Sequence, residues 1–344
     1  MNERQAFLRL VRPVNLLLVA AACAALKFNI INPLVSTSPV EIDSPVAIMD
    51  FVLMSLMLVL LTAAGNIIND YFDLRVDRLN KPNRVLIDKH IRRRVAMAGH
   101  VVFNVLAVLI GLYLSWRWKS IPILVLPFFI AGSLWYYSVT FKKQFLSGNL
   151  VVGLLAALLP VSIGLLEIPP ITEAYVPAIT DLLAQYGLEG DPSAIFKGMW
   201  VWMLAYSAYC FMLTLIREIQ KDMEDEEGDR LAGFRTLAVV WGVNRAKYIT
   251  AGLMVLSIAS ISGLSWFLYG TMETGKMLLY LALSVVFMVL PLSFSLGSTL
   301  MAKDKTGFAR ASLYTKLAIA GIIVYTFVFA HNINPEYYSF LTFD

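Results

Sequence analysis

The chain has 344 residues, of which 58% are hydrophobic and 15% charged, and its formal net charge is +4. A soluble globular domain is typically about 45–50% apolar and about 25% charged, so the composition excludes an ordinary soluble domain and indicates a protein that lies in lipid. Two cysteines and three histidines are too few for a disulfide framework or a histidine-rich metal cluster.

Nine apolar runs are long enough to cross a bilayer, which takes roughly 17–25 residues. They fall at 13–31, 47–69, 95–116, 120–141, 147–166, 198–217, 248–269, 276–300 and 311–331. No Gly/Ser-rich linker or low-complexity tract divides the chain. We therefore predict an all-α fold, with about nine transmembrane helices in a single membrane domain over residues 1–344.

The lysines and arginines predict how the chain is threaded through the membrane, because cytoplasmic loops carry an excess of both. With a cytoplasmic N-terminus, 23 of the 28 lie on inner segments and five on outer ones. We expect an integral protein of the cell's inner membrane, with its C-terminus outside. The proline- and glycine-containing segment 167–197 is predicted as an external loop with a short helix around 178–186.

The second apolar run ends in an acidic stripe. Asp70, Asp73 and Asp77 are spaced three and four residues apart, and Asn69 lies four residues before Asp73. Residues at these spacings share one face of a helix. Like charges so placed repel one another, which indicates that something cationic offsets them.

The same spacing recurs after the sixth apolar run, in Asp222, Asp225 and Asp229. The two motifs, near 66–84 and 217–238, both face the cytoplasm in the charge-derived topology. A duplicated half of the chain would explain the repeat, and so would independent recurrence of a useful pattern. The sequence leaves both explanations open.

Two facing aspartate stripes suit a hard divalent cation. Mg²⁺ usually binds through one or two carboxylates and keeps waters and substrate phosphates as its other ligands. We therefore predict Mg²⁺ ions that bridge these stripes to a diphosphate. The predicted metal ligands are Asp70, Asp73, Asp77, Asp222, Asp225 and Asp229. The alternative, ordinary solvated loop charges, is disfavoured by the identical spacing of the two motifs.

Basic residues lie where a diphosphate would need them. Lys221 precedes Asp225 by four residues, Arg84 follows the first motif, and Lys142 ends the fourth apolar run. Charge-assisted hydrogen bonds from such groups would stabilise the charge that grows on a departing diphosphate. The alternative for each is the positive-inside bias, which needs no substrate.

These residues resemble the UbiA-type intramembrane prenyltransferases. Residues 69–77 read NDYFDLRVD and resemble the NDxxDxxxD signature of that superfamily. Residues 222–229, DMEDEEGD, are similar to its second aspartate motif, and residues 12–15, RPVN, to its N-terminal pattern. With nine predicted spans, the resemblance covers essentially the whole chain.

The resemblance implies a helical bundle around a central cavity, with cap loops and an active site on the cytoplasmic side. It also implies Mg²⁺-dependent ionisation of an allylic prenyl diphosphate, whose carbocation is captured by an acceptor. The residues in the catalytic role would be Asn69, Asp73, Asp77, Asp225 and Asp229. The diphosphate would be bound by Arg84, Lys142, Lys221 and Tyr137. Tyr137 departs from the family pattern, because it lies five residues before Lys142 where many members have four.

The acceptor is suggested by details of the first motif. It lacks the inserted glycine of many menaquinone-pathway members and continues as Asn-Lys-Pro-Asn-Arg, which is most similar to digeranylgeranylglyceryl-phosphate synthase-like members. We expect a prenyl diphosphate donor, (geranylgeranyl)glyceryl phosphate as a lipid-type hydrophobic acceptor, contact with membrane lipid, and no nucleic-acid partner. An aromatic or quinone-precursor acceptor is the alternative.

A different class of protein, an ion-coupled transporter, also has acidic residues in its membrane part. Transport sites usually lie near the bilayer midplane on broken helices, whereas both stripes here follow the ends of apolar runs. The sequence therefore favours the transferase. It leaves open the length of the prenyl chain and the oligomeric state.

Overall fold

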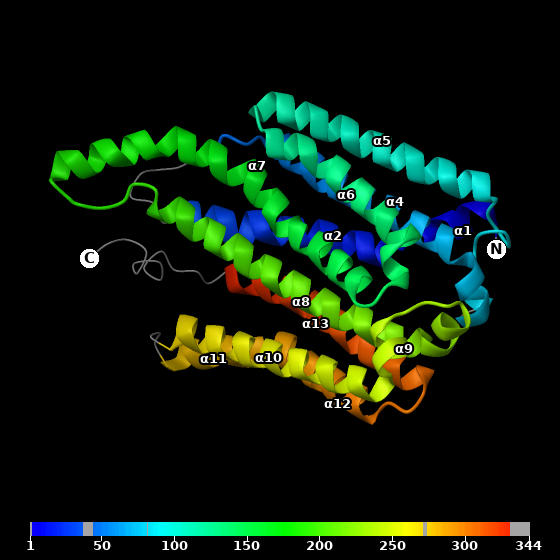
Figure 1. Ribbon diagram of the computed structural model, residues 1–344. Helices are drawn as coiled ribbons and strands as arrows, with labels where there is room; N and C mark the ends of the chain where they lie inside the picture. The colour runs from blue at the N-terminus through cyan, green and yellow to red at the C-terminus, as the bar shows by residue number, and fades with distance from the viewer. Residues whose placement is uncertain (1, 37–43, 81, 271–273, 331–344) are drawn as a thin grey trace.

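The structure, a computed structural model, describes residues 2–36, 44–80, 82–270 and 274–330. Within these residues the regular elements are all helical, apart from one isolated bridge between Ile87 and Ile91. Nine helical segments of the described chain are long and apolar enough to cross a membrane (Figure 1). The predicted all-α fold with about nine spans is confirmed.

The elements follow one another in a simple order. The first half contains α1 (Glu3–Leu10), α2 (Pro13–Leu26), the π-helix η1 (Lys27–Ile31), α3 (Asn32–Ser36), α4 (Ile48–Asn80), the 3-10 helix η2 (Pro82–Arg84), α5 (Arg93–Trp118) and α6 (Ile121–Val139). The second half contains the 3-10 helix η3 (Phe141–Lys143), α7 (Ser147–Tyr186), α8 (Ala194–Leu231), α9 (Leu237–Trp241), α10 (Val243–Tyr269), α11 (Thr274–Ser284), the π-helix η4 (Val285–Val289), α12 (Leu290–Met301) and α13 (Lys305–Ala330).

The apolar runs fold as helices because lipid offers their backbone no other hydrogen-bond partner. Polar side chains within them bond to their own helix, as where the Ser55 hydroxyl donates to the carbonyl of Phe51 at 2.9 Å. The short helix α1 is more polar and begins with a capping box formed by Asn2 and Gln5. It lies at the end of the bundle where α4 ends (Figure 1).

Helix α7 is longer than the sequence predicts. The run 147–166 was expected to end in an external loop, but the helix continues without a break to Tyr186 and includes Pro169, Pro170 and Pro177. A proline removes one helical hydrogen bond and kinks a helix without always ending it. At about 1.5 Å per residue, the 40 residues of α7 exceed the hydrocarbon core of a bilayer, which is about 30 Å thick.

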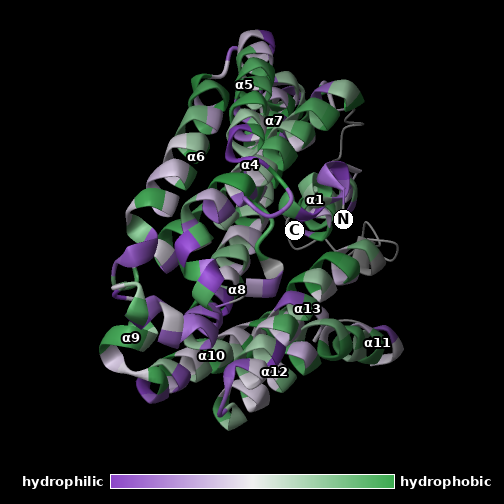
Figure 2. Ribbon diagram, turned by 90° about the vertical axis from the view of Figure 1, so that its right-hand side faces the viewer, coloured by the Kyte–Doolittle hydropathy of each residue, from purple (hydrophilic) through white to green (hydrophobic). Residues whose placement is uncertain are grey.

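Five helices, α2, α4, α7, α8 and α13, form a ring. In this ring α2 packs on α4 and α13, α8 packs on α7 and α13, and α4 packs on α7 and α8. Helix α5 packs on α4, and α6 packs on both α4 and α7. Helix α10 packs on α8, and α12 packs on α13. Figure 2 looks onto the end of the bundle where α4 and α8 finish, and hydrophilic residues gather there. We call this the motif end.

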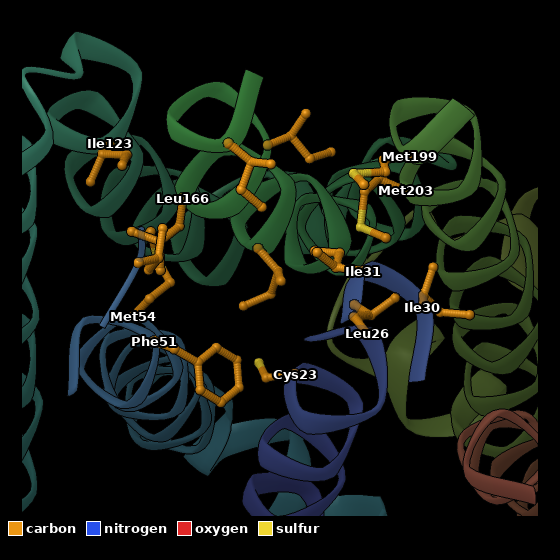
Figure 3. Close-up of a cluster of buried hydrophobic side chains, with 14 of the residues drawn as sticks. Cys23, Leu26, Ile30, Ile31, Phe51, Met54, Ile123, Leu166, Met199 and Met203 are labelled. Carbon is orange, nitrogen blue, oxygen red and sulfur yellow. The ribbon is translucent and has the colours of Figure 1, made fainter. Parts of the chain in front are cut away.

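The opposite end of the bundle is closed by the largest group of buried apolar side chains. Its members come mainly from η1 and from the helices α2 to α8, and they include Cys23, Ile30, Phe51, Leu166 and Met203 (Figure 3). One ion pair is enclosed beside this core: Lys27 Nζ lies 2.5 Å from Glu167 Oε1, and the two side chains are 5% and 0% exposed.

Candidate active site

The two aspartate motifs lie on the final turns of α4 and α8. These two helices meet at their ends, where the Asn80 side-chain amide donates a hydrogen bond to the backbone carbonyl of Asp225 at 3.3 Å. Gly228 allows this approach, because a Cβ at that position would overlap the Asn80 side chain. The fold therefore brings together two motifs that are about 150 residues apart in the sequence.

One cavity of about 1250 Å³ lies between these helices. Ten of the predicted site residues line it: Asn69, Asp70, Asp73, Asp77, Tyr137, Lys142, Lys221, Asp222, Asp225 and Asp229. The remaining predicted residue, Arg84, has a side chain outside the described part of the structure. Two motifs and a lysine from a third segment are thus joined in one place, as the sequence predicts.

The same cavity continues into the bundle between apolar side chains. These come from α2, α4, α6, α7, α8 and α13 and include Leu18, Leu58, Leu61, Leu134, Leu155, Leu159, Leu213, Ile319, Ile322 and Ile323. The cavity is therefore polar and charged at the motif end and apolar deeper in the bundle. That arrangement suits an amphiphile with an anionic head and a long hydrocarbon chain.

Lys142 connects the first motif to the segment after α6. Its ammonium pairs with Asp73 and donates to the side-chain oxygen of Asn69 at 3.2 Å. Burial alone would lower the pKa of Lys142, but Asp73 and its other neighbours together outweigh burial, so the pKa lies above its ordinary value. The ammonium therefore stays charged and gives the cavity a fixed cation beside Asp73.

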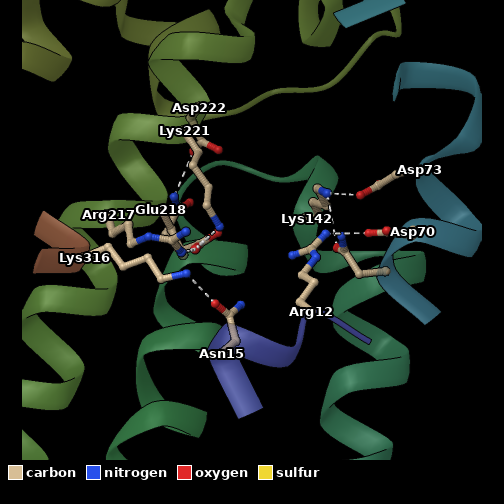
Figure 4. Close-up of polar contacts among 12 residues, drawn as sticks. Arg12, Asn15, Asp70, Asp73, Lys142, Arg217, Glu218, Lys221, Asp222 and Lys316 are labelled. Carbon is tan, nitrogen blue, oxygen red and sulfur yellow. Dashed lines mark hydrogen bonds and ion pairs between the residues drawn. The ribbon is translucent and has the colours of Figure 1, made fainter. Parts of the chain in front are cut away.

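A second cation, Arg12, reaches the first motif from the N-terminal segment. Its guanidinium Nη2 lies 2.5 Å from Asp70 Oδ1 (Figure 4). Burial would lower the pKa of Arg12, but Asp70 and Glu218 raise it above its ordinary value. Arg12 is the N-cap of α2 and has a φ of 56°, a left-handed conformation that an L side chain adopts at a cost. The sequence pattern includes Arg12, but its spacing alone does not indicate a partner 58 residues away.

The second motif has its own polar neighbours on α7 and α8. Asn149 donates its side-chain amide to Asp222 Oδ2 at 2.8 Å. Glu218 accepts from Lys221 at 2.5 Å and from Arg217 at 3.4 Å. Glu218 lies four residues before Asp222 and therefore shares the helix face of the second stripe. Nothing in the sequence singles out Asn149, because an isolated asparagine at the start of an apolar run has no distinguishing neighbours.

The side chains present fit a magnesium diphosphate better than a bare metal ion. Among the described residues, no three His, Cys, Asp or Glu side chains lie close enough together to hold a metal by themselves. Mg²⁺ needs only one or two carboxylates if a substrate phosphate completes its coordination. The cavity offers hard oxygen donors on two helices, with cations beside them. The assignment of all six aspartates as ligands stays a prediction.

The amino-acid sequence matches a known family of membrane enzymes and named relatives. A family model described as "UbiA prenyltransferase family" matches residues 34–317. Two relatives are both named digeranylgeranylglyceryl phosphate synthase. The one from Methanothermobacter thermautotrophicus is 30% identical over 75% of this chain and 77% of its own length. The one from Saccharolobus solfataricus is also 30% identical, over 79% of this chain and 82% of its own length.

Solved structures show the same arrangement of helices. A structure described as digeranylgeranylglyceryl phosphate synthase in membranes superposes with a TM-score of 0.58 at 22% identity, covering 96% of this chain and 99% of that one. A UbiA homologue from Archaeoglobus fulgidus, bound to DMAPP and Mg²⁺, gives a TM-score of 0.54 at 18% identity and covers 95% of this chain and 99% of that one. At these identities the likeness concerns the fold.

Proposed function

The chain belongs to the UbiA prenyltransferase family, and from that premise we propose that it transfers a prenyl group from an allylic prenyl diphosphate to (geranylgeranyl)glyceryl phosphate. One observation carries the proposal. A single cavity joins two aspartate stripes and their cations at one end to an apolar interior at the other. A prenyl diphosphate likewise joins a charged head to a long apolar chain.

The motif end would bind the diphosphate with Mg²⁺. Asp73 and Asp77 on α4 and Asp225 and Asp229 on α8 would hold the ion, with the first aspartate of each motif assisting. Bound Mg²⁺ neutralises phosphate charge and so helps the diphosphate to leave. The relevant support is the donor chemistry of these side chains and the Mg²⁺ bound in a solved homologue of the same fold.

The cations of the site would stabilise the departing group directly. Lys142, fixed beside Asp73 and Asn69, is placed to donate to a diphosphate oxygen from the α6 side. Lys221 approaches from α8. Tyr137, five residues before Lys142, also lines the cavity, and its hydroxyl would donate to the diphosphate as well. Such charge-assisted bonds gain strength as negative charge develops on the diphosphate.

The apolar interior would hold the hydrocarbon chain and keep water from the allylic carbocation. The two relatives described above are named as synthases of digeranylgeranylglyceryl phosphate, which supports (geranylgeranyl)glyceryl phosphate over an aromatic or quinone-precursor acceptor. The excess of lysine and arginine at the motif end supports a cytoplasmic site in a cell's inner membrane, with the N-terminus on the same side.

The test is a transfer assay on the purified full chain in nanodiscs. Mg²⁺ and geranylgeranyl diphosphate are combined with geranylgeranylglyceryl phosphate, 4-hydroxybenzoate or a naphthoate as acceptor. We expect product from the first acceptor only. Asp73→Asn and Asp225→Asn should each lower the rate on the order of 100-fold or more, because each removes a carboxylate that would hold the Mg²⁺ on the diphosphate.

The control is Asp191→Asn, which changes an exposed aspartate outside the cavity and should leave the rate unchanged. Product from an aromatic acceptor instead would move the chain to the quinone-precursor branch. If no acceptor is prenylated, and geranylgeranyl diphosphate with Mg²⁺ does not raise the melting temperature, the transferase assignment is wrong. Ion-coupled transport then becomes the leading alternative.

A further inference from the structure

A second group of basic side chains lines the cavity on the side of α13. Lys316 on α13 donates its ammonium to the side-chain oxygen of Asn15 on α2, at 2.7 Å. In the described part of the chain no carboxylate lies within ion-pairing distance of Lys316. In Figure 4 Lys316 and Arg217 lie on one side of the site, and Lys142, Asp73 and Asp70 lie on the other. The α13 side is therefore cationic and set apart from the first aspartate motif.

Arg217 adds a charge that its surroundings only partly satisfy. Its contact with Glu218 is long, at 3.4 Å, and Glu218 also binds Lys221 at 2.5 Å. One carboxylate thus serves two cations. The Nε of Arg217 is buried and has no hydrogen-bond partner among the described residues. A buried guanidinium nitrogen without an acceptor is costly, which indicates that an anionic ligand completes its bonding.

The cations on this side also repel one another. Lys316 lies within electrostatic range of both Arg217 and Arg12. Arg12 has a close carboxylate of its own, Asp70 at 2.5 Å, whereas Arg217 shares the more distant Glu218 with Lys221. Charges of one sign at membrane depth are expensive unless a counter-charge offsets them. A dianionic group between Lys316 and Arg217 would supply that counter-charge and would accept from both.

Helix α13 continues from Lys316 into the bundle with apolar residues. Ile319 and Ile323 follow Lys316 by three and seven residues and line the same cavity deeper in the bundle. Residues at this spacing share a helix face. A single face of α13 therefore presents an ammonium at the motif end and then an apolar stripe. This order fits a phosphate monoester attached to a long hydrocarbon chain.

We propose that Lys316 and Arg217 form a separate subsite for the phosphate of the acceptor, with Asn15 positioning the lysine ammonium. The inference rests on the proposed function and deepens it, because it assigns the donor's diphosphate to the aspartate motifs and the acceptor's phosphate to the cations nearest α13. The apolar chain of the acceptor lies along α13. Recognition of the acceptor then depends on its phosphate as well as on its chain.

The test compares acceptors with and without that phosphate. Steady-state rates are measured in nanodiscs for wild type and Lys316→Gln with geranylgeranylglyceryl phosphate, and with geranylgeranylglycerol, which lacks the phosphate. We expect the variant to raise the KM for the phosphorylated acceptor on the order of 10- to 100-fold, the effect of losing a hydrogen bond between charged groups. The KM for the donor should stay within about twofold of wild type. For geranylgeranylglycerol the variant and wild type should not differ.

Two matched variants and one binding measurement complete the design. Lys316→Arg keeps the charge and should recover most of the affinity. Lys305→Gln removes a charge from the same helix outside the cavity, where Lys305 pairs with Glu227 at 3.2 Å, and should leave every parameter unchanged. Titration of the phosphorylated acceptor without donor or Mg²⁺, followed by melting temperature, gives the affinity even for a variant without turnover. Inorganic phosphate in the same titration shows whether the headgroup binds without its chain.

The outcomes separate the subsite from the reaction. If wild type prenylates the acceptor and Lys316→Gln has an unchanged acceptor KM, the subsite is wrong while the reaction stands. An equal loss with both acceptors would also overturn the subsite, because it would show a general defect. If wild type gives no product with any acceptor, the reaction itself is wrong.

Discussion

The ion pair of Lys27 and Glu167 is the most enclosed charged contact outside the active site. It lies at the end of the bundle remote from the motifs, and Glu167 also accepts from the Ser44 hydroxyl at 3.1 Å. Removing one partner of such a pair leaves a buried charge without compensation, whereas replacing both with apolar groups is often close to neutral. The arrangement gives a clear expectation at the scale of single residues.

We expect Lys27→Met to destabilise the protein by about 3–5 kcal/mol, the usual effect of breaking a buried pair. Adding Glu167→Met should restore much of that loss. Thermal unfolding in detergent measures both. The matched control is Lys197→Met, which breaks the exposed pair with Asp191 and should leave the melting temperature unchanged. Equal melting temperatures for Lys27→Met and wild type would show that water reaches this site.

Asp88 predicts how the segment after the first motif responds to pH. It accepts from Arg93 at 2.7 Å and from Arg78 at 3.0 Å, and these arginines lower its pKa below the ordinary 3.8. A lowered pKa stabilises the fold above the unfolded-state value, and this contribution disappears as the pH falls through the folded-state value. The protection of residues 85–92 from hydrogen exchange should therefore stay constant from pH 8 to pH 4. It should decrease only at lower pH, where Asp88 becomes protonated and its contacts with the arginines weaken.

Asp88→Asn is the control for this behaviour. Asn tolerates the left-handed backbone at this position, where φ is 67°, and so it removes the charge without adding strain. In this variant the segment should exchange faster than in wild type near neutral pH. Its protection should show no further loss in acid, because there is no carboxylate left to protonate. A wild-type increase already at pH 6 would mean that another group controls the segment.

At the scale of elements, the contact between the ends of α4 and α8 decides whether the two motifs face each other. Replacing a glycine inside a helix with alanine normally stabilises the helix by up to about 1 kcal/mol. We expect the opposite for Gly228→Ala, because the new methyl group would displace Asn80 from its hydrogen bond to Asp225. Both transfer activity and melting temperature should fall.

Gly252→Ala on α10 is the comparison, since a Cβ there meets no other atom within 4 Å. It should keep full activity and melt at the wild-type temperature or slightly above. If Gly228→Ala behaves in the same way as Gly252→Ala, the close approach of α4 and α8 is not required for the active site.

At the scale of the whole molecule, the sequence predicts best those features that the lipid bilayer constrains. Span number follows from the length of apolar runs, and the aspartate stripes follow from helical spacing. The length of α7 does not, because Pro169 and Pro170 are typical of an ended helix as well as of a kinked one. Whether the two motifs reflect a duplicated half, and whether 1–344 is one domain, stay predictions.

The missed contacts are those that join distant parts of the chain. Arg12 meets Asp70 across 58 residues and Lys27 meets Glu167 across 140. Periodicity describes which face of a helix a residue occupies, but it does not say which helix packs against that face. These partners are fixed only when the ring of helices is assembled, so one sequence without that packing cannot assign them.

The ring around the cavity closes where α2 packs against α13, and Asn15 and Lys316, which bridge them, are 301 residues apart. Among the described spans, α2 is the first to enter the membrane during synthesis and α13 is the last to leave the ribosome. Until then the cavity has no wall on the side of α13 and stays open to lipid. We therefore expect the nascent chain to be inactive until α13 is in place, because the side of the cavity that carries Lys316 is the last part of the described bundle to form.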